Sequence, residues 1–176
     1  MEHKELISLL YPQMQNLGYQ KVDEFHITLP MKEIVITSVI VRRAEGPRFD
    51  IVLAVIFIHK SDSLAWNKFK REDAKMESTL YELLLNMGES AEYLDKLFYN
   101  VPNDTTMDVI EKNLPVIFEL YKNKVLPYFE KWNDYSWLIE NFEMEIFLKT
   151  FDAYFDIEDC IEFFKLQLRT RQSMLN

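Results

Sequence analysis

Two consecutive runs of β-branched and other apolar residues decide the fold: IVITSVIVRR at residues 34–43 and FDIVLAVIFI at residues 49–58. Valine, isoleucine and threonine favour extended backbone because their branched side chains pack well on a pleated surface. A turn sequence, Glu45-Gly46-Pro47, separates the runs. The pattern therefore predicts two antiparallel strands joined as a hairpin through Glu45–Pro47. Both faces of the second run are apolar, which predicts a central strand covered on both sides.

The chain before this hairpin predicts a helix followed by one more strand. Pro12 lies inside the helix and is expected to kink it or to split off its first turn. Gly18 follows the helix, at a position where a C-cap favours a residue with positive φ. The next strand is predicted within residues 22–29, so that residues 20–60 form an antiparallel meander of three strands. The helix is indicated by apolar residues at helical spacing: Leu6, Leu9, Leu10, Met14 and Leu17.

Residues 62–101 leave two alternatives open. Their composition suits a long helix. The same residues could equally form a loop followed by strands near Thr79–Leu85 and Lys96–Val101. Periodicity does not distinguish helix from strand in apolar runs this short.

From about Asp104 the pattern becomes helical. A capping signal at Thr105-x-x-Asp108 precedes a long apolar face, which Pro115 and Pro127 are expected to bend or divide. A short helix near residues 136–142 and a helix from about Glu143 to Tyr154 are expected to follow.

The last helix is expected to begin after Asp156, whose side chain can cap it. Its cations Lys165, Arg169 and Arg171 are expected near its end, where they oppose the carbonyl end of the helix dipole. The whole chain, residues 1–176, is therefore predicted to be one α+β domain. It combines an N-terminal helix, an antiparallel sheet of three to five strands, and a helical C-terminal half packed against that sheet. The core face of the last helix is predicted to be Ile157, Ile161, Phe164 and Leu168.

The composition predicts a soluble, cytoplasmic protein with no membrane partner. Apolar residues make up 48% of the chain, which is enough for a core without a metal or a disulfide. The single cysteine, Cys160, excludes an internal disulfide and suits a reducing compartment. The first residues are charged and do not resemble a signal peptide. The longest apolar run, Ile51–Ile58, has eight residues, whereas a bilayer-spanning helix needs about 20.

The net charge of −9 is concentrated in one window. Residues 134–162 contain nine acids and one base, Lys149, and so carry −8. A field of this sign repels phosphate, which predicts no nucleic-acid binding and favours a basic protein as partner. The alternative stays open that these acids only keep an aromatic-rich helical surface soluble. The candidate partner surface is formed by Glu143, Glu145, Asp152, Asp156, Glu158, Asp159 and Glu162.

Aromatic residues are interleaved with these acids. Twelve of the 25 aromatic residues lie between Tyr128 and Phe164. Most of them must be core, but Tyr135, Trp137 and Tyr154 are expected to be partly exposed beside carboxylates. Aromatic anchors surrounded by charge are typical of protein interfaces. A helical path through Asp152, Asp156 and Asp159 is expected to bring these carboxylates to one side.

Candidate catalytic and metal-binding residues are few. His3, His26 and His59 show no metal-ligand spacing, although His26 and His59 could meet across neighbouring strands. Cys160 is interpreted as a small buried hydrophobe. The acids from Asp152 to Asp159 lack the glycine and the alternating ligands of a calcium loop. Three isolated glycines cannot form a phosphate-binding loop. The sequence predicts no catalytic residue, no metal and no cofactor.

Several segments resemble the bacterial family called domain of unknown function 4304. These are Leu17-Gly18-Tyr19-x-Lys21 after the first helix, Phe49-Asp50-Ile51 in the hairpin, and Val125-Leu126-Pro127-Tyr128-Phe129-Glu130-Lys131-Trp132 before a short helix. The order of these elements covers about three quarters of the chain. The chain departs from the family by its acidic end beyond Phe142 and by Phe25 in place of a tryptophan. The resemblance implies a bacterial cytoplasmic protein and strands near residues 79–85 and 96–101, and it implies no activity.

Three hypotheses of function follow. The first is a non-enzymatic protein-binding module, such as an immunity or antitoxin-like protein that binds a basic partner through its acidic helical face. The second is a regulatory or small-ligand-binding bacterial domain. The third is a hydrolase-type enzyme with a site assembled from scattered carboxylates and histidines.

Overall fold

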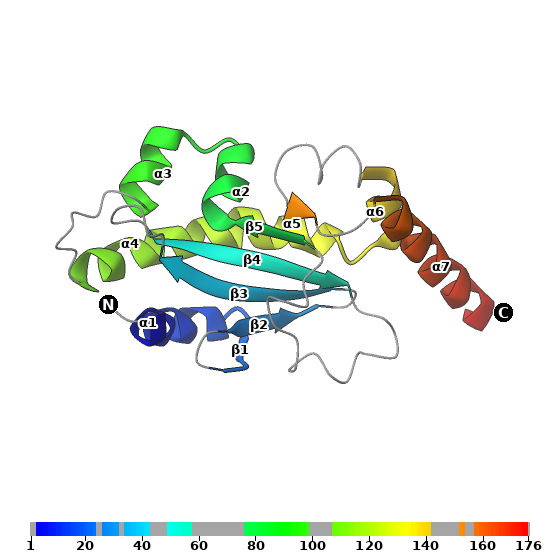
Figure 1. Ribbon diagram of the computed structural model, residues 1–176, viewed down its shortest axis with the longest axis horizontal. Helices are drawn as coiled ribbons and strands as arrows, with labels where there is room; N and C mark the ends of the chain where they lie inside the picture. Colours follow the sequence, from blue (N-terminus) through cyan, green and yellow to red (C-terminus); the bar gives the residue numbers. More distant parts are fainter. Residues whose placement is uncertain are drawn as a thin grey trace.

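The computed structural model describes residues 3–23, 26–31, 34–42, 49–57, 76–98, 107–141, 152–153 and 157–175. It has the mixed α+β class that the sequence predicts, with helices packed against an antiparallel sheet (Figure 1). Among the predicted features that lie outside the described residues are the turn at Glu45–Pro47, the cap at Thr105 and the cap at Asp156.

The sheet has six strands, and their order in the sheet is their order along the chain. All neighbouring strands are antiparallel. The number exceeds the three to five strands expected, because a two-residue strand lies at each edge. The strands are β1 (Gln20–Lys21), β2 (Ile27–Pro30), β3 (Ile34–Arg42), β4 (Phe49–Phe57), β5 (Met76–Thr79) and β6 (Asp152–Ala153).

The two strands β3 and β4 form the centre of the sheet and confirm the predicted antiparallel pair. Ile34 lies opposite Phe57 at one end of the pair, and Arg42 lies opposite Phe49 at the other. Alternate residues of β4 from Ile51 to Phe57 join the main core. The opposite face of β4 is also buried, so the strand is covered on both sides, as its apolar pattern predicts. The buried residues of that opposite face are Val52, Ala54 and Ile56.

Of the single strand expected within residues 22–29, the structure shows strand only from Ile27, in β2, whereas β1 ends at Lys21. The backbone N–H of Val22 donates to the carbonyl of His26 at 3.0 Å. The side chain of Asp23 accepts a hydrogen bond from the backbone N–H of His26 at 2.8 Å. An aspartate that bonds nearby backbone offers the chain a turn in place of a continuing ladder. The meander therefore begins with the short β1–β2 hairpin.

The structure describes residues 76–98 of the segment 62–101, and neither alternative holds there as a whole: residues 80–86 and 91–98 are helical, but they do not form one long helix. The strand β5 is followed by two short helices, α2 (Leu80–Asn86) and α3 (Ala91–Phe98). The family resemblance also implied strands near Thr79–Leu85 and Lys96–Val101. The structure shows helix instead, from residue 80 in the first range and over residues 96–98 in the second.

Local capping explains where α2 begins and ends. The hydroxyl of Thr79 accepts a hydrogen bond from the backbone N–H of Glu82 at 3.2 Å and so caps the helix start. Gly88, with φ of +96°, follows the helix. The N–H groups of Gly88 and Glu89 donate to the carbonyls of Leu85 and Leu84, which is the Schellman arrangement.

The first helix, α1 (His3–Gln15), contains Pro12 and ends in the same way. Gly18 has φ of +92°, and the N–H groups of Gly18 and Tyr19 donate to the carbonyls of Gln15 and Met14. This confirms the C-cap predicted at Gly18.

The chain from residue 107 is helical almost throughout its described part. Pro115 lies inside α4 (Met107–Leu120) without dividing it, whereas the division expected at Pro127 is confirmed. Two elements, η3 (Tyr121–Val125) and α5 (Leu126–Lys131), follow α4, and α6 (Tyr135–Asn141) and α7 (Ile157–Leu175) come later.

The element η3 is a π-helical turn, and Pro127 explains its position. Proline has no N–H and its ring clashes with the carbonyl four residues back in an α-helix. In η3 the N–H of Leu126 instead donates to the carbonyl of Tyr121, five residues back, so the turn is wider. The continuous α-helix is interrupted immediately before the proline.

One expected helix is partly wrong. Residues 152–153 form strand β6 beside β5, so the helix predicted from Glu143 to Tyr154 does not extend over them. Residues 142–151 lie outside the described residues. A strand of two residues carries too little pattern to be predicted, because its pairing depends on the exposed edge of β5.

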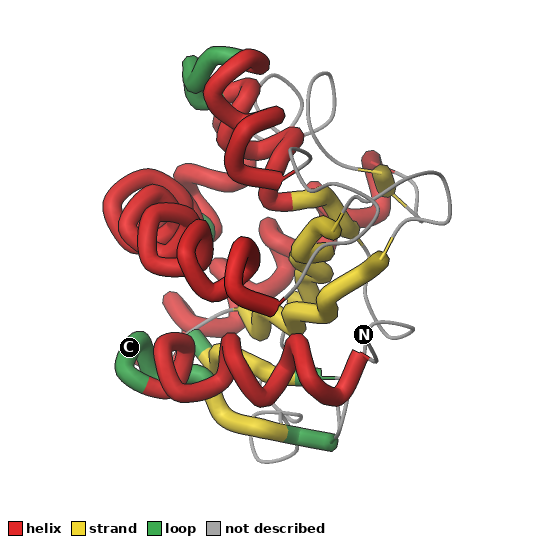
Figure 2. The backbone as a smooth tube through the Cα atoms, turned by 90° about the vertical axis from the view of Figure 1, so that its left-hand side faces the viewer, coloured by secondary structure: helices red, strands yellow, loops and turns green. Residues whose placement is uncertain are grey.

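One cluster of buried side chains joins the sheet to the helices. Figure 2 shows that most helices lie on one side of the strands. The ring of Phe57 in β4 stacks on Trp132 at a centroid distance of 6.2 Å, and Trp132 is completely buried. Within the described ranges, no helix combines the length and the apolar character that crossing a bilayer requires.

Candidate functional site

Four of the seven acids of the candidate partner surface lie within the described residues. Asp152 lies in β6, where its backbone is opposite Glu77 of β5. Glu158 and Asp159 lie in the first turn of α7, and Glu162 follows one turn later. These three helix residues are exposed. The remaining acids of the surface, Glu143, Glu145 and Asp156, lie outside the described residues.

The inner side of α7 attaches the helix to the body of the protein. The ring of Phe164 is completely buried and lies edge-on to Phe57 at 4.9 Å. It also stacks on Tyr135 of α6 at 5.5 Å, and the guanidinium of Arg171 lies 5.0 Å from the centre of the Tyr135 ring. The predicted core face is confirmed for the residues with described side chains, namely Ile161, Phe164 and Leu168.

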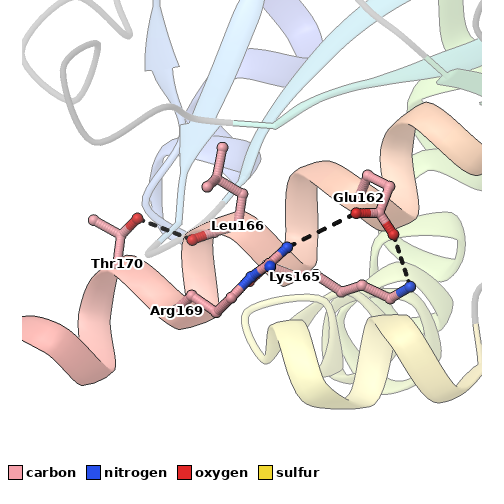
Figure 3. A network of polar contacts seen from close by, with 5 residues as sticks. All are labelled: Glu162, Lys165, Leu166, Arg169 and Thr170. Atoms are coloured by element: carbon pink, nitrogen blue, oxygen red, sulfur yellow. Dashed lines mark hydrogen bonds and ion pairs between the residues drawn. The ribbon is translucent and has the colours of Figure 1, made fainter.

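The outer side of α7 carries a network of charged side chains (Figure 3). The ammonium of Lys165 donates to Glu162 at 2.8 Å, and the guanidinium of Arg169 lies 3.8 Å from the other carboxylate oxygen. The hydrogen bond and the charge of Lys165 lower the pKa of Glu162, so this carboxylate stays ionised at neutral pH. All three side chains are largely exposed, so water screens these ion pairs and they stabilise the fold little.

The cations of α7 lie further from the helix end than expected. The helix continues to Leu175, and its last turn contains no basic residue. Lys165 and Arg169 therefore interact with Glu162, and Arg171 interacts with the ring of Tyr135. The exposed side of α7 is thus acidic in its first two turns and basic in the following two.

The helical path expected through Asp152, Asp156 and Asp159 is wrong, because Asp152 lies in a strand. Asp152 and Asp159 belong to separate elements, and no helical spacing relates them. Asp134, the first acid of the window, caps α6: its carboxylate accepts from the backbone N–H of Ser136 at 2.8 Å. This acid therefore has a structural role in addition to its charge.

The aromatic residues near the acids differ in exposure. Tyr135 was expected to be partly exposed but is buried between α6 and α7. Trp137 is half-buried, and the ammonium of Lys131 lies 5.9 Å from its ring centre. Tyr154 lies outside the described residues. Sequence position alone did not distinguish Tyr135 from Trp137, because the packing of α7 decides which ring is covered.

His26 is the one histidine whose side chain the structure describes. Its Nδ1 lies 2.8 Å and 3.0 Å from the two carboxylate oxygens of Asp23. His59 lies outside the described residues, and the strand order places β3 between β2 and β4, so β2 and β4 are not neighbours. The Asp23 partner was not predicted, although its spacing of three residues across a turn is a recognisable signal.

Cys160 is half-buried on α7 and packs against the core cluster, in agreement with its interpretation as a small apolar residue. Over the part of the chain that the structure describes, no three His, Cys, Asp or Glu residues are arranged to hold a metal ion.

The π-helical turn η3 holds two polar contacts that the sequence did not reveal. The hydroxyl of Tyr121, its first residue, shares a hydrogen bond with the hydroxyl of Tyr19, and both rings are buried. Burial, together with the neighbouring Tyr19, raises the pKa of Tyr121 well above its usual value. The ammonium of Lys124 pairs with the carboxylate of Glu89, which follows the cap at Gly88. Pro127 is the only local sequence signal for this turn.

Comparison with known proteins gives no match for this chain among family models, curated proteins or solved structures.

Proposed function

We propose that this protein is a non-enzymatic protein-binding module that binds a basic protein through its acidic C-terminal surface, as an immunity or antitoxin-like protein does. The surface consists of the first two turns of α7, with Glu158, Asp159 and Glu162, together with the neighbouring acids of the window from residue 134 to residue 162.

One observation carries the proposal: α7 exposes acids on the side opposite to an anchored aromatic face. Phe164 holds the inner side against Phe57 and Tyr135, whereas Glu158, Asp159 and Glu162 are exposed. A partner therefore meets charges on a fixed helix, and little ordering is required on binding. Acids in the first turn of a helix interact favourably with the helix dipole, so the acids of this surface also stabilise α7.

Exposed charges affect binding mainly through the rate of association. A concentrated negative field attracts a basic partner over several ångströms and is weakened by salt. The same charges contribute little to folding. Reversing them should thus weaken capture of the partner and leave the fold intact.

The test is capture of partners from a bacterial lysate by the wild-type chain and by the variant E158K/D159K/E162K. The matched control is E82K/E111K/E119K, which reverses three exposed acids on α2 and α4 and includes an acid in the first turn of a helix. We expect a basic protein to be captured by wild type and control but not by the α7 variant at moderate salt. Equal capture by all three folded chains would refute the proposal.

The proposal also includes a bacterial origin and a cytoplasmic location for the protein. Both are supported by the resemblance to the family called domain of unknown function 4304 and by the single cysteine of the chain. Immunofluorescence or fractionation of the source bacterium tests the location directly.

A second candidate function, binding of a small ligand by a regulatory domain, is favoured by the pair formed by Asp23 and His26. The carboxylate orients the imidazole through Nδ1, which makes Nε2 the ring atom that could bind a ligand. A thermal-shift screen with a metabolite library tests it. A ligand that stabilises wild type but neither H26A nor D23N would support this candidate, and no stabilising ligand would count against it.

A further inference from the structure

The outer side of α7 presents a continuous stripe of residues. Their spacings of three, four, three and four place them on one face of the helix, as in a coiled-coil seam. This face is opposite to the buried Phe164. All residues of the stripe are exposed: Asp159, Glu162, Leu166, Arg169 and Ser173.

The charges of this stripe change sign along the helix. Asp159 and Glu162 precede Leu166, and Arg169 follows Leu166. Lys165 is the residue directly before Leu166. We propose that a second copy of this chain binds along the stripe with its α7 antiparallel, forming a two-fold symmetric dimer. In that arrangement the acidic turns of one copy lie against the basic turns of the other in both halves of the interface, on either side of Leu166. A parallel arrangement would oppose acid to acid and base to base.

Exchanging the existing ion pairs between copies would remove little stability from each copy. Glu162 already interacts with Lys165 and Arg169 on its own helix, and these exposed pairs are screened by water. Equivalent pairs between two helices would exclude part of this water. The apolar side chain of Leu166, which is 54% exposed, lies at the centre of the stripe and would be covered close to the two-fold axis.

The helix is accessible to a second copy. Figure 1 shows α7 projecting from the sheet, with the C-terminus at its tip. Figure 3 shows Glu162, Lys165, Leu166 and Arg169 along the exposed helix. The stripe from Asp159 to Ser173 is about 20 Å long at the rise of an α-helix. One helix per copy forms a small interface, so the dimer should be weak and sensitive to salt.

This inference shares Asp159 and Glu162 with the proposed function but does not rest on it. Self-association is measured on the purified chain alone, whereas the proposed function is measured by capture of another protein. Failure of either measurement therefore leaves the other informative.

The test is sedimentation equilibrium of the purified chain at low ionic strength, up to about 0.5 mM, where a dimer with a dissociation constant in the millimolar range becomes detectable. We expect a reversible dimer that dissociates as salt is added. A chain that stays monomeric at the highest concentration and lowest salt overturns the proposal.

Two charge variants test the pairing. D159K/E162K makes the stripe basic, and K165E/R169E makes it acidic. Each alone should associate at least about tenfold more weakly than wild type, whereas their mixture should form a heterodimer. The control pair E92K and K96E reverses an exposed ion pair of α3 and should dimerise like wild type. Unchanged self-association of both stripe variants would exclude α7 as the interface.

Disulfide cross-linking tests the orientation, in a background of Cys160→Ser. An antiparallel pair brings the two copies of residue 166 together and separates the two copies of residue 173 by about 20 Å. L166C should cross-link and S173C should not. Cross-linking of both variants would indicate parallel helices and contradict the proposal.

Discussion

The hydroxyl groups of Tyr19 and Tyr121 share a hydrogen bond inside the core, although 102 residues separate them in the sequence. Their ring centres lie 6.1 Å apart. Tyr19 follows the cap of α1, and Tyr121 begins the π-helical turn. The bond therefore connects the end of α1 to the point where the α-helical geometry of α4 changes to the π-helical geometry of η3.

We expect a coupled loss of stability when this pair is removed. Y19F or Y121F leaves the other hydroxyl buried without this partner and should destabilise the fold by about 1–3 kcal/mol. The double variant should cost less than the sum of the single variants, because no tyrosine hydroxyl then remains to be satisfied. Urea denaturation of the four chains gives the coupling energy. Additive losses would show that the two hydroxyls do not stabilise each other.

The raised pKa of Tyr121 predicts a loss of stability at high pH. Burial keeps this phenol protonated in the folded chain, whereas tyrosine in the unfolded chain ionises at about pH 10. Above that pH the unfolded chain binds fewer protons than the folded chain, so the free energy of unfolding falls as pH rises. The contribution of one such group approaches about 1.4 kcal/mol per pH unit.

Urea unfolding from pH 8 to pH 11 tests this dependence. Y121F should lose stability less steeply than wild type above pH 10. The control is Y93F, because Tyr93 is exposed on α3, and its slope should equal that of wild type. Equal slopes for wild type and Y121F would contradict the expected role of burial.

The ion pair of Lys124 with Glu89 should stabilise the fold more than an exposed pair. The side chain of Glu89 is 17% exposed, and the pair connects the α2–α3 turn to η3. Replacing either partner leaves a partly buried charge, and we expect K124M or E89Q to cost about 1 kcal/mol. The matched control is the pair Glu92–Lys96 on α3, for which K96M should cost at most about 0.5 kcal/mol. Equal losses at both sites in thermal unfolding would refute this difference.

The attachment of α7 should depend on Phe164. Its completely buried ring contacts β4 and α6, so F164A should destabilise the protein by about 3–5 kcal/mol. Phe163, its half-buried neighbour, is the control, and F163A should cost clearly less. Hydrogen exchange should show α7 losing protection first in F164A. Similar losses for both variants would mean that α7 is not anchored by this ring.

The features that could be predicted from the sequence are encoded by neighbouring residues. The β3–β4 pair follows from two β-branched runs of matched length, because branched side chains favour the pleated conformation locally. The cap at Gly18 follows from the freedom of glycine to adopt positive φ. The division at Pro127 follows from a missing N–H group, although its π-helical form does not.

The net charge of the candidate partner surface could be predicted from the sequence, but the arrangement of its acids in space could not. The acids of residues 134–162 can be counted in the sequence, and their net charge does not depend on the structure. Which of them lie together depends on whether each segment is a helix or a strand. Asp152 was expected on a helix and lies on the edge strand β6, whereas Glu158, Asp159 and Glu162 share the exposed turns of α7.

The sequence by itself determined the class of the fold, the central strand pair, the end of the first helix at Gly18 and the position of the negative charge. Only the tertiary structure decided that β5 continues into α2, that β6 pairs with β5, and that Tyr19 meets Tyr121. The physical reason is the range of the interactions. Backbone preferences are set by neighbouring residues, and charge can be read from the sequence directly. The secondary structure of a short apolar run and the hydrogen bonding of a buried hydroxyl depend instead on partners that are distant in the sequence.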